Sequence, residues 1–385
     1  MSRRVLAAAS ELARGRPTPF YLFDAGAAAE SARRSRSAAR EIGRLDVFYP
    51  WKCNRHPGLL AAVAREGLGA EVTSLRDLAA ALAAGLAGGR IVFQGPAKDP
   101  SSLDRALACG AWIVADSAED AAAILGRARA LGGKPRYLLR LRAAACQPEQ
   151  QGFGMVAAEV VAVARRAVEQ RQAAPEGLAF HLGTGLTSVA PYSSALREAA
   201  ELAKRLGSLG IRVRVLDLGG GFAAAGEARR DTRGRAPKVP PLERFVRRVA
   251  AEAARAFPGA RLLVEPGRAV ASDAFHLVSR VIRVRGKRVY VDASRLSHAF
   301  FVPRGKHPFR PIPFRGSRTR RSQIAGPLPV GLDVLSSSEA IGLPREGDLL
   351  VIGSVGAYNL IASNEWAGDR AEVVEIEAMA RLAGD

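Results

Sequence analysis

The sequence predicts an α/β protein in which a (β/α)8 barrel is joined to a C-terminal all-β domain. Short apolar runs alternate with segments of helical spacing from residue 18 to residue 265, with connections short enough for parallel βαβ units. About eight such units fit before residue 270, the number that a closed barrel needs. After Val270 the long helical segments end and the pattern becomes β-rich. A doubly wound open sheet is the alternative, but it usually has fewer strands.

The predicted barrel region consists of apolar runs separated by alanine- and leucine-rich stretches. The runs expected to form strands span residues 18–24, 45–52, 69–74, 90–95, 112–116, 136–141, 177–181, 213–217 and 261–265. The stretches expected to form helices span residues 25–42, 57–66, 75–84, 101–109, 117–131, 157–170, 193–209 and 242–257. At 385 residues and 48% apolar composition, the chain can bury this barrel and a smaller domain.

The second domain is predicted from β-type runs at residues 275–285, 287–292, 347–352 and 371–376. We place the barrel at residues 26–270 and assign residues 1–25 and 271–385 to the β-domain. Residues 302–321 are basic and contain prolines, so this stretch is either a surface loop or the entrance of a site that binds an anion.

The composition narrows the class of partner. A net charge of +20, almost all of it arginine, favours acidic partners or substrates. Nucleic-acid binding is disfavoured, because no helix-turn-helix, zinc-finger or RNA-binding signature is present and aromatic residues make up 6%. No apolar run is long enough to span a bilayer, and the N-terminal apolar run is too short for a signal peptide. Three cysteines without metal-ligand spacing indicate a reduced, cytoplasmic protein with no metal site.

Chemically distinctive residues follow four of the predicted strands. Lys52, His181, the turn Asp217-Leu-Gly-Gly-Gly and the segment Glu265-Pro-Gly-Arg each stand at a strand end, where such barrels carry their sites. Desolvation is expected to lower the pKa of Lys52, and a neutral amine can form a Schiff base. Taken alone, a strand-end lysine more often extends to solvent, and a lone histidine is more often a packed residue. Together the four ends supply an amine, a flat ring, backbone amides and a carboxylate, which suit a phosphorylated aromatic aldehyde.

The motifs at these ends make the chain resemble the fold-type III pyridoxal-phosphate decarboxylases, and most closely the diaminopimelate branch. Tyr49-Pro-Trp-Lys-Cys-Asn54 is similar to the family's Tyr-Ala-x-Lys-Ala-Asn. Residues 69–74 are similar to Gly-Ala-x-x-x-Ser. Four further motifs match almost letter for letter, at residues 216–222, 265–268, 291–293 and 356–358. The resemblance extends from Thr18 to Tyr358 and implies the alanine-racemase-like barrel fold. Alanine racemases themselves lack the Glu-Pro-Gly-Arg pattern.

The resemblance implies roles for individual residues. Lys52 would hold pyridoxal 5′-phosphate, His181 would stack on its ring, and Glu265 would pair with the ring nitrogen, keeping the ring an electron sink. The phosphate or the substrate carboxylate would be met by Gly220, Gly221, Gly267, Arg268 and Tyr358. The family works as a head-to-tail homodimer whose sites combine one barrel with the partner's β-domain. Asp333 and Tyr358 would therefore reach the neighbouring subunit's cofactor.

The substrate-facing motifs depart from the family. The family's Gly-Pro-x-Cys-Glu-Ser-x-Asp is replaced by Gly326-Pro-Leu-Pro-Val-Gly-Leu-Asp333, so Pro329 takes the place of the proton-donating cysteine and Val330 that of the acidic residue. In the segment Arg310-Pro-Ile-Pro-Phe314, the phenylalanine replaces a tyrosine. Gln151-Gly-Phe-Gly also replaces the usual Ser-Lys-Phe-Gly. The hydroxyl, the thiol and the acid that meet the substrate are therefore lost.

We hypothesise a decarboxylase whose substrate is not diaminopimelate, lysine or ornithine. An anionic or acylated amino acid, including one tethered to an acidic carrier protein, fits a site without its acidic anchor. Lys52 is the first choice as replacement proton donor, and His298 or a water is the second. Two alternatives stay open: decarboxylation-dependent transamination or racemisation on the same cofactor, and a non-catalytic binding homologue.

Overall fold

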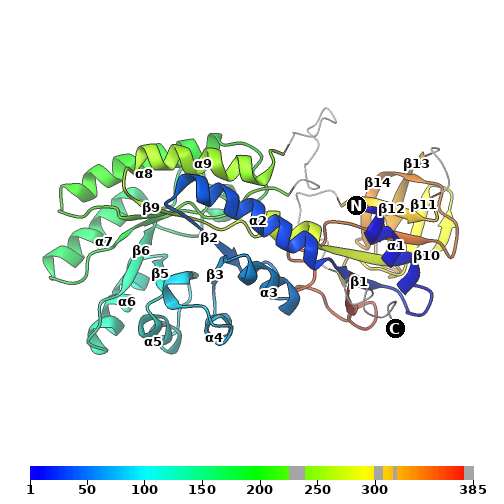
Figure 1. Ribbon diagram of the computed structural model, residues 1–385, viewed down its shortest axis with the longest axis horizontal. Helices are drawn as coiled ribbons and strands as arrows, with labels where there is room; N and C mark the ends of the chain where they lie inside the picture. The colour runs from blue at the N-terminus through cyan, green and yellow to red at the C-terminus, as the bar shows by residue number, and fades with distance from the viewer. Residues whose placement is uncertain (225–238, 299–306, 315–318, 377–385) are drawn as a thin grey trace.

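The computed structural model describes residues 1–224, 239–298, 307–314 and 319–376. They form a closed parallel barrel and a separate, mostly antiparallel sheet, which lie at opposite ends of an elongated molecule (Figure 1). The predicted (β/α)8 barrel with a β-domain is confirmed. Among the described residues, no helix is both long enough and apolar enough to cross a bilayer.

The barrel is closed by pairing of its first and last strands. Its eight parallel strands are β2 (Leu45–Pro50), β3 (Gly69–Val72), β4 (Ile91–Phe93), β5 (Trp112–Ala115), β6 (Arg136–Arg140), β7 (Gly177–Ala179), β8 (Val215–Asp217) and β9 (Arg261–Val264). The register of β2 against β9 aligns Leu45 with Leu262 and Val47 with Val264. Because each strand contributes buried apolar residues, the barrel interior is a packed core.

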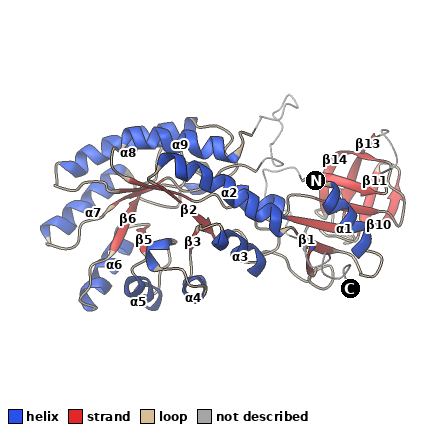
Figure 2. Cartoon of the chain, in the orientation of Figure 1, coloured by secondary structure: helices blue, strands red, loops and turns tan. Residues whose placement is uncertain are grey.

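Helices surround the barrel, as Figure 2 shows. They are α2 (Ala25–Ile42), α3 (Pro57–Arg65), α4 (Leu75–Ala83), α5 (Pro100–Cys109), α6 (Ala118–Ala130), α7 (Ala157–Glu169), α8 (Ala190–Gly207), α9 (Leu242–Ala256) and the short α10 (Arg268–Ala271), with 3₁₀ turns at Gly88–Arg90, Pro148–Gln150 and Ser272–Ala274. Side-chain caps fix several helix starts: Asp24, Ser74, Asp99 and Ser117 each accept a hydrogen bond from a backbone amide three residues on. These caps place the strand–helix turns, and hence the strand ends, in fixed positions.

The β-domain combines the two ends of the chain. Its strands are β1 (Phe20–Phe23), β10 (Phe275–Arg285), β11 (Arg288–Val291), β12 (Phe309–Ile312), β13 (Thr319–Ala325), β14 (Val334–Gly342), β15 (Leu349–Ile352) and β16 (Val373–Glu375). The order is β12-β15-β10-β11-β13-β14, and β1 pairs with both β10 and β16. The helix α1 (Arg3–Leu12) buries Val5, Ala8 and Ala9 against this sheet.

Several elements of the β-domain were not predicted from the sequence. α1 was missed because its apolar face is mostly small residues, and β13 and β14 were missed because they are polar. The basic stretch 302–321 was expected to be a loop, but its described part contains β12 and the start of β13. Residues 302–306 and 315–318 of that stretch lie outside the described residues.

Candidate active site

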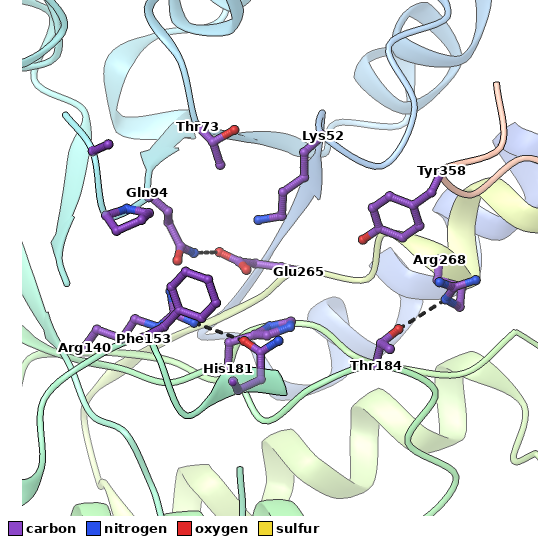
Figure 3. A pocket seen from close by; sticks show the side chains of 14 residues that line it. Lys52, Thr73, Gln94, Arg140, Phe153, His181, Thr184, Glu265, Arg268 and Tyr358 are labelled. Atoms are coloured by element: carbon purple, nitrogen blue, oxygen red, sulfur yellow. Dashed lines mark hydrogen bonds between the residues drawn. The ribbon is translucent and has the colours of Figure 1, made fainter. Parts of the chain in front are cut away.

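A cavity of about 430 Å³ opens at the carboxyl ends of the barrel strands (Figure 3). It is lined by Lys52, Thr73, Gln94, Gly95, Pro96, Ala97, Arg140, Gln150, Phe153, His181, Thr184, Glu265, Arg268 and Tyr358. A smaller recess of about 50 Å³ adjoins it and is lined in part by Gly183, Gly221, Gly267 and Arg268. Of the predicted site residues, the two spaces together bring Lys52, His181, Gly221, Glu265, Gly267, Arg268 and Tyr358 into one place.

Lys52 projects into this cavity from the turn that follows β2. Its Nζ lies 2.6 Å from Oε1 of Glu71, and its side chain is 39% exposed because the cavity is open. Burial alone would lower the pKa of Lys52, but the nearby carboxylates of Glu71 and Glu265 outweigh it, and the net pKa is raised. The expected lowering is therefore wrong: an apolar strand end would have lowered the pKa, but this strand end is surrounded by acids.

Three buried carboxyl groups lie beneath Lys52. Glu71 is on β3, Asp217 ends β8, and Glu265 directly follows β9. Glu265 accepts a hydrogen bond from Nε2 of Gln94, and Oδ1 of Asp217 accepts one from the amide of Gly219 at 2.9 Å. Oε2 of Glu71 is buried and has no hydrogen-bond partner within the described part of the chain.

The carboxyls of Asp217 and Glu265 are both buried and lie close enough for each to shift the pKa of the other. Burial raises the pKa of Asp217 to about 6. Burial, together with the charges of Asp217 and Glu71, raises the pKa of Glu265 well above its ordinary value. The surroundings of Glu265 therefore favour its protonated form.

His181 contributes a neutral ring. Its Nδ1 accepts a hydrogen bond from the amide of Gly220 at 3.2 Å, so Nε2 carries the proton. Burial, with the positive charges of Lys52 and Arg140 adding to it, lowers the pKa of His181 to about 3. The imidazole therefore stays uncharged and is held in one orientation.

The glycine turn after β8 brings backbone close to the cavity. A Cβ on Gly220 would lie 2.3 Å from the carbonyl oxygen of Glu265. At Gly221, which has a φ of +97°, a Cβ would lie 2.4 Å from the carbonyl oxygen of Gly183. Neither contact can be relieved by a side-chain movement, so only glycine fits there.

Arg268 and Tyr358 border the smaller recess. Nε of Arg268 donates to Oγ1 of Thr184 at 3.2 Å, and its guanidinium carbon lies 5.1 Å from the centre of the Tyr358 ring. Tyr358 has a φ of +69°, an unusual conformation for a tyrosine, and its amide donates to the carbonyl of Cys53 at 2.9 Å. This hydrogen bond ties Tyr358 to the turn that carries Lys52.

The remaining predicted substrate residues lie away from this cavity. Arg310 is exposed on β12, and Phe314 is 66% exposed. His298, the second choice of proton donor, is buried in the β-domain, where its Nδ1 lies 3.2 Å from the Tyr21 hydroxyl.

Asp333 has a different surrounding from the one expected. Its side chain is buried within its own chain, where it accepts hydrogen bonds from the Ser294 hydroxyl at 2.9 Å and from the amides of Arg295 and Leu328 at 2.7 and 3.0 Å. A carboxylate engaged in this way holds its own loop, and its predicted contact with the neighbouring subunit's cofactor stays a prediction.

Three further side chains near the cavity were missed by sequence reasoning, Glu71, Gln94 and Arg140, and the strand-end residue Asp217 was given no role of its own. Gln94 directly follows β4, and Arg140 ends β6, where its Nη1 lies 2.9 Å from Oδ1 of Asp116. The strand-end rule that pointed to Lys52 would have found both. Glu71 instead lies within β3, and its role depends on which face of the strand turns inward. Among the described residues, no group of three or more His, Cys, Asp or Glu side chains could hold a metal ion.

Comparison with known proteins gives consistent results. The family described as pyridoxal-dependent decarboxylase, pyridoxal binding domain, matches residues 28–272. The chain is 32% identical to the diaminopimelate decarboxylase of Actinosynnema pretiosum, over 97% of this chain and 87% of that protein. It is 30% identical to the diaminopimelate decarboxylase of Deinococcus radiodurans, over 91% of this chain and 87% of that protein.

Solved structures share the fold. The lysine/ornithine decarboxylase of Vibrio vulnificus, complexed with putrescine, superposes with a TM-score of 0.82 at 20% identity, over 97% of this chain and 99% of that chain. The diaminopimelate decarboxylase of Helicobacter pylori, complexed with L-lysine, gives a TM-score of 0.82 at 24% identity, over 97% and 98%. With the sequence matches, these similarities establish that the chain belongs to the pyridoxal-dependent decarboxylase family and is a pyridoxal-phosphate-dependent carboxy-lyase.

Proposed function

We propose that this decarboxylase acts on an amino acid or amino-acid derivative whose side chain carries no distal ammonium group, so that diaminopimelate is not its substrate. The observation that carries the proposal is the loop from Gly326 to Asp333. Its tip presents Val330, 36% exposed, and Leu332, 71% exposed, where the family's motif has an acidic residue. Apolar side chains cannot neutralise an ammonium group, so a diamino acid would lose its charged partner.

The residues of the cavity fit pyridoxal phosphate. We assign Lys52 as the amine that holds it, and the neutral ring of His181 as the flat surface against its ring. The recess lined by Gly221, Gly267 and Arg268 suits the phosphate, because backbone amides and a guanidinium are its usual partners. Gly220 and Tyr358 complete this end of the site. When bound, the cofactor supplies an electron sink for the electrons released by loss of CO₂.

The buried carboxyl pair explains how the ring nitrogen is charged. We infer that Glu265 is protonated before the cofactor binds, because burial and the charges of Asp217 and Glu71 raise its pKa. A basic nitrogen placed against this carboxyl can take that proton, leaving an ionised Glu265 as its partner. The proton then stays inside the site instead of being drawn from solvent.

The basic character of the chain supports an anionic or acylated substrate. The net charge is +20, and Arg140 and Arg268 both line the cavity. A substrate tethered to an acidic carrier protein is one member of this class. In the proposed homodimer, the loop 326–333 of one subunit would border the cavity of the other, as the family resemblance implies, with Arg310 and Phe314 on the same domain.

The proposal is tested by measuring CO₂ release from diaminopimelate, lysine and ornithine, and from neutral, anionic and N-acylated amino acids. We expect the last three classes to be turned over at least tenfold more efficiently than any diamino acid. The variant Val330→Glu should raise kcat/KM for diaminopimelate about tenfold, the scale of one charge-assisted contact. Val168→Glu, an equally exposed position on α7, is the matched control. Efficient turnover of diaminopimelate by the unaltered enzyme would refute the proposal.

A second reaction is favoured by one observation. Pro329 replaces the family's proton-donating cysteine, and a proline side chain has no proton to give. Protonation on a cofactor carbon would then compete with protonation on the substrate and lead to decarboxylation-dependent transamination. Pyridoxamine phosphate accumulating during turnover, and decreasing in Pro329→Cys, would support this reaction. Turnover without pyridoxamine phosphate would leave simple decarboxylation, with Lys52 as our proposed donor.

A further inference from the structure

A second cavity, of about 610 Å³, lies between α3 and α4 on the outside of the barrel. We propose that this α3–α4 groove binds a small carboxylate with an apolar body, such as a medium-chain fatty acid. The proposal is independent of the substrate proposed above. The volume falls in the range of small-molecule sites, and the lining is mostly apolar with a few charged groups, which is the usual composition of such sites.

The groove exists because small side chains face each other across it. Ala61 and Ala64 on α3, Ala80 on α4 and Ala84 at the C-terminal cap of α4 line it, and all four are exposed. Their spacing of three or four residues puts each pair on one helix face. Alanines leave room between the two helices that longer side chains would fill. Trp51, Val63 and Leu68 are buried and provide an apolar floor.

The charges around the groove select an anion. Arg65 and Arg76 are exposed in its lining, and neither has a carboxylate partner among the described residues. The one acidic residue in the lining, Asp77, is neutralised by Arg55, whose Nε and Nη2 lie 2.6 and 2.8 Å from its two carboxylate oxygens. The groove therefore carries excess positive charge beside an apolar floor. A carboxylate with an apolar body complements both features, whereas an amine of the same size would be repelled.

The groove also adjoins the proposed active site through one turn. Trp51 lines the groove, and the next residue, Lys52, lines the cavity at the strand ends. The amide of Trp51 donates to the carbonyl of Glu71 at 2.9 Å, so this turn is fixed to β3. A ligand in the groove would contact the side chain next to the lysine.

The test is calorimetric titration of the full chain with octanoate, and with octylamine as the cationic counterpart. We expect saturable binding of one octanoate per chain and no saturable binding of octylamine. Ala80→Trp should fill the groove and weaken octanoate binding at least tenfold, whereas Ala162→Trp, at an exposed position of α7, should leave it unchanged. The double variant Arg65→Gln/Arg76→Gln should weaken binding at least fivefold, with Arg165→Gln as its control.

Several outcomes would overturn the proposal. These are no saturable binding at millimolar octanoate, binding that Ala80→Trp leaves intact, or binding that the double arginine variant leaves intact. If Ala80→Trp does not fold, Ala84→Leu on the same face gives the same test with a smaller side chain. A further outcome is that the unaltered chain does not bind octanoate and that Ala80→Trp changes the oligomeric state in solution. That result would show that a second copy of the chain covers the groove, and it would also overturn the proposal.

Discussion

The strand-end cavity and the loop 326–333 differ in how their side chains are held. In the cavity, Glu265 directly follows β9 and Lys52 lies two residues after β2. Their partners Gln94 and Glu71 lie directly after β4 and on β3. In the loop, one buried carboxylate, that of Asp333, fixes a turn whose tip is apolar and exposed. The proposed cofactor end thus depends on the pairing of the barrel strands, whereas the loop 326–333, which we propose faces the substrate, can change its tip without disturbing the barrel. This difference explains how one chain keeps the family's cofactor motifs and loses its substrate motifs.

The largest expected effect comes from removing the amine of the cavity. Lys52→Ala should reduce decarboxylation at least about a thousandfold, because the covalent attachment and the proposed proton donor are lost together. Borohydride should no longer fix pyridoxal phosphate to the protein, as measured by absorbance and peptide mass. Lys134→Ala, at an exposed position outside the cavity, is the control and should keep both properties. Retained activity in Lys52→Ala would show that Lys52 is neither the attachment point of the cofactor nor the proton donor.

Glu265→Gln should lower the activity of the enzyme and raise the stability of the cofactor-free protein. We expect kcat to fall about a hundredfold, since the charged partner of the ring nitrogen is lost. In the cofactor-free protein the same variant should be more stable at pH 8. A carboxyl whose folded pKa is raised contributes stability below its unfolded pKa of about 4 and loses it as pH rises through the folded pKa.

At pH 8 the unfolded chain releases this proton freely, whereas the folded state resists its release. Glutamine removes that penalty and should raise the free energy of unfolding by roughly 2 kcal/mol. Urea unfolding at pH 8 measures it, with the exposed Glu201→Gln as control. Lower stability at pH 8 would contradict the raised pKa of Glu265.

Asp333→Ala should destabilise the protein, because the loop 326–333 loses the carboxylate that holds it. Three donors lose their acceptor, the Ser294 hydroxyl and the amides of Arg295 and Leu328, so the free energy of unfolding should fall by about 2–3 kcal/mol. Leu332→Ala, at the exposed tip of the same loop, should leave stability within about 0.5 kcal/mol. Unchanged stability in Asp333→Ala, with only KM altered, would restore the originally expected role in substrate binding.

The smallest expected effect is a pH dependence of the β-domain opposite to that of the carboxyl pair. Burial lowers the pKa of His276 to about 4. A histidine with a depressed folded pKa contributes stability above its unfolded pKa of about 6.5 and loses it as pH falls toward the folded value. Stability should therefore drop by about 1–2 kcal/mol between pH 7 and pH 5 through this residue. His276→Met should flatten the dependence in urea unfolding, and an equal slope in both proteins would contradict it.

The sequence predicted the strand-end residues because their positions depend on the chain order alone. Lys52, His181 and Glu265 each follow an apolar run, and parallel strands bring such ends together. Glu71 could not be recognised in this way, since its reach to Lys52 depends on the pairing of β2 with β3. The contacts of Asp333 within its own loop could not be predicted either, because the direction of its carboxylate is set by the folded turn. The strands β13 and β14 carry polar residues, so their pairing is not visible in hydrophobic periodicity.

The position of β1 has a consequence for how the chain is made. Phe20–Phe23 pairs with residues 275–278 on one side and with residues 373–375 on the other, so both neighbours of this early strand are synthesised after the whole barrel. A nascent chain can close its barrel once β9 has left the ribosome. Until β10 follows, β1 has no partner strand, and until β15 and β16 are made, the sheet that covers α1 is incomplete. The β-domain is therefore the last part of the molecule to form, and the barrel can close while β1 still lacks its partner strands.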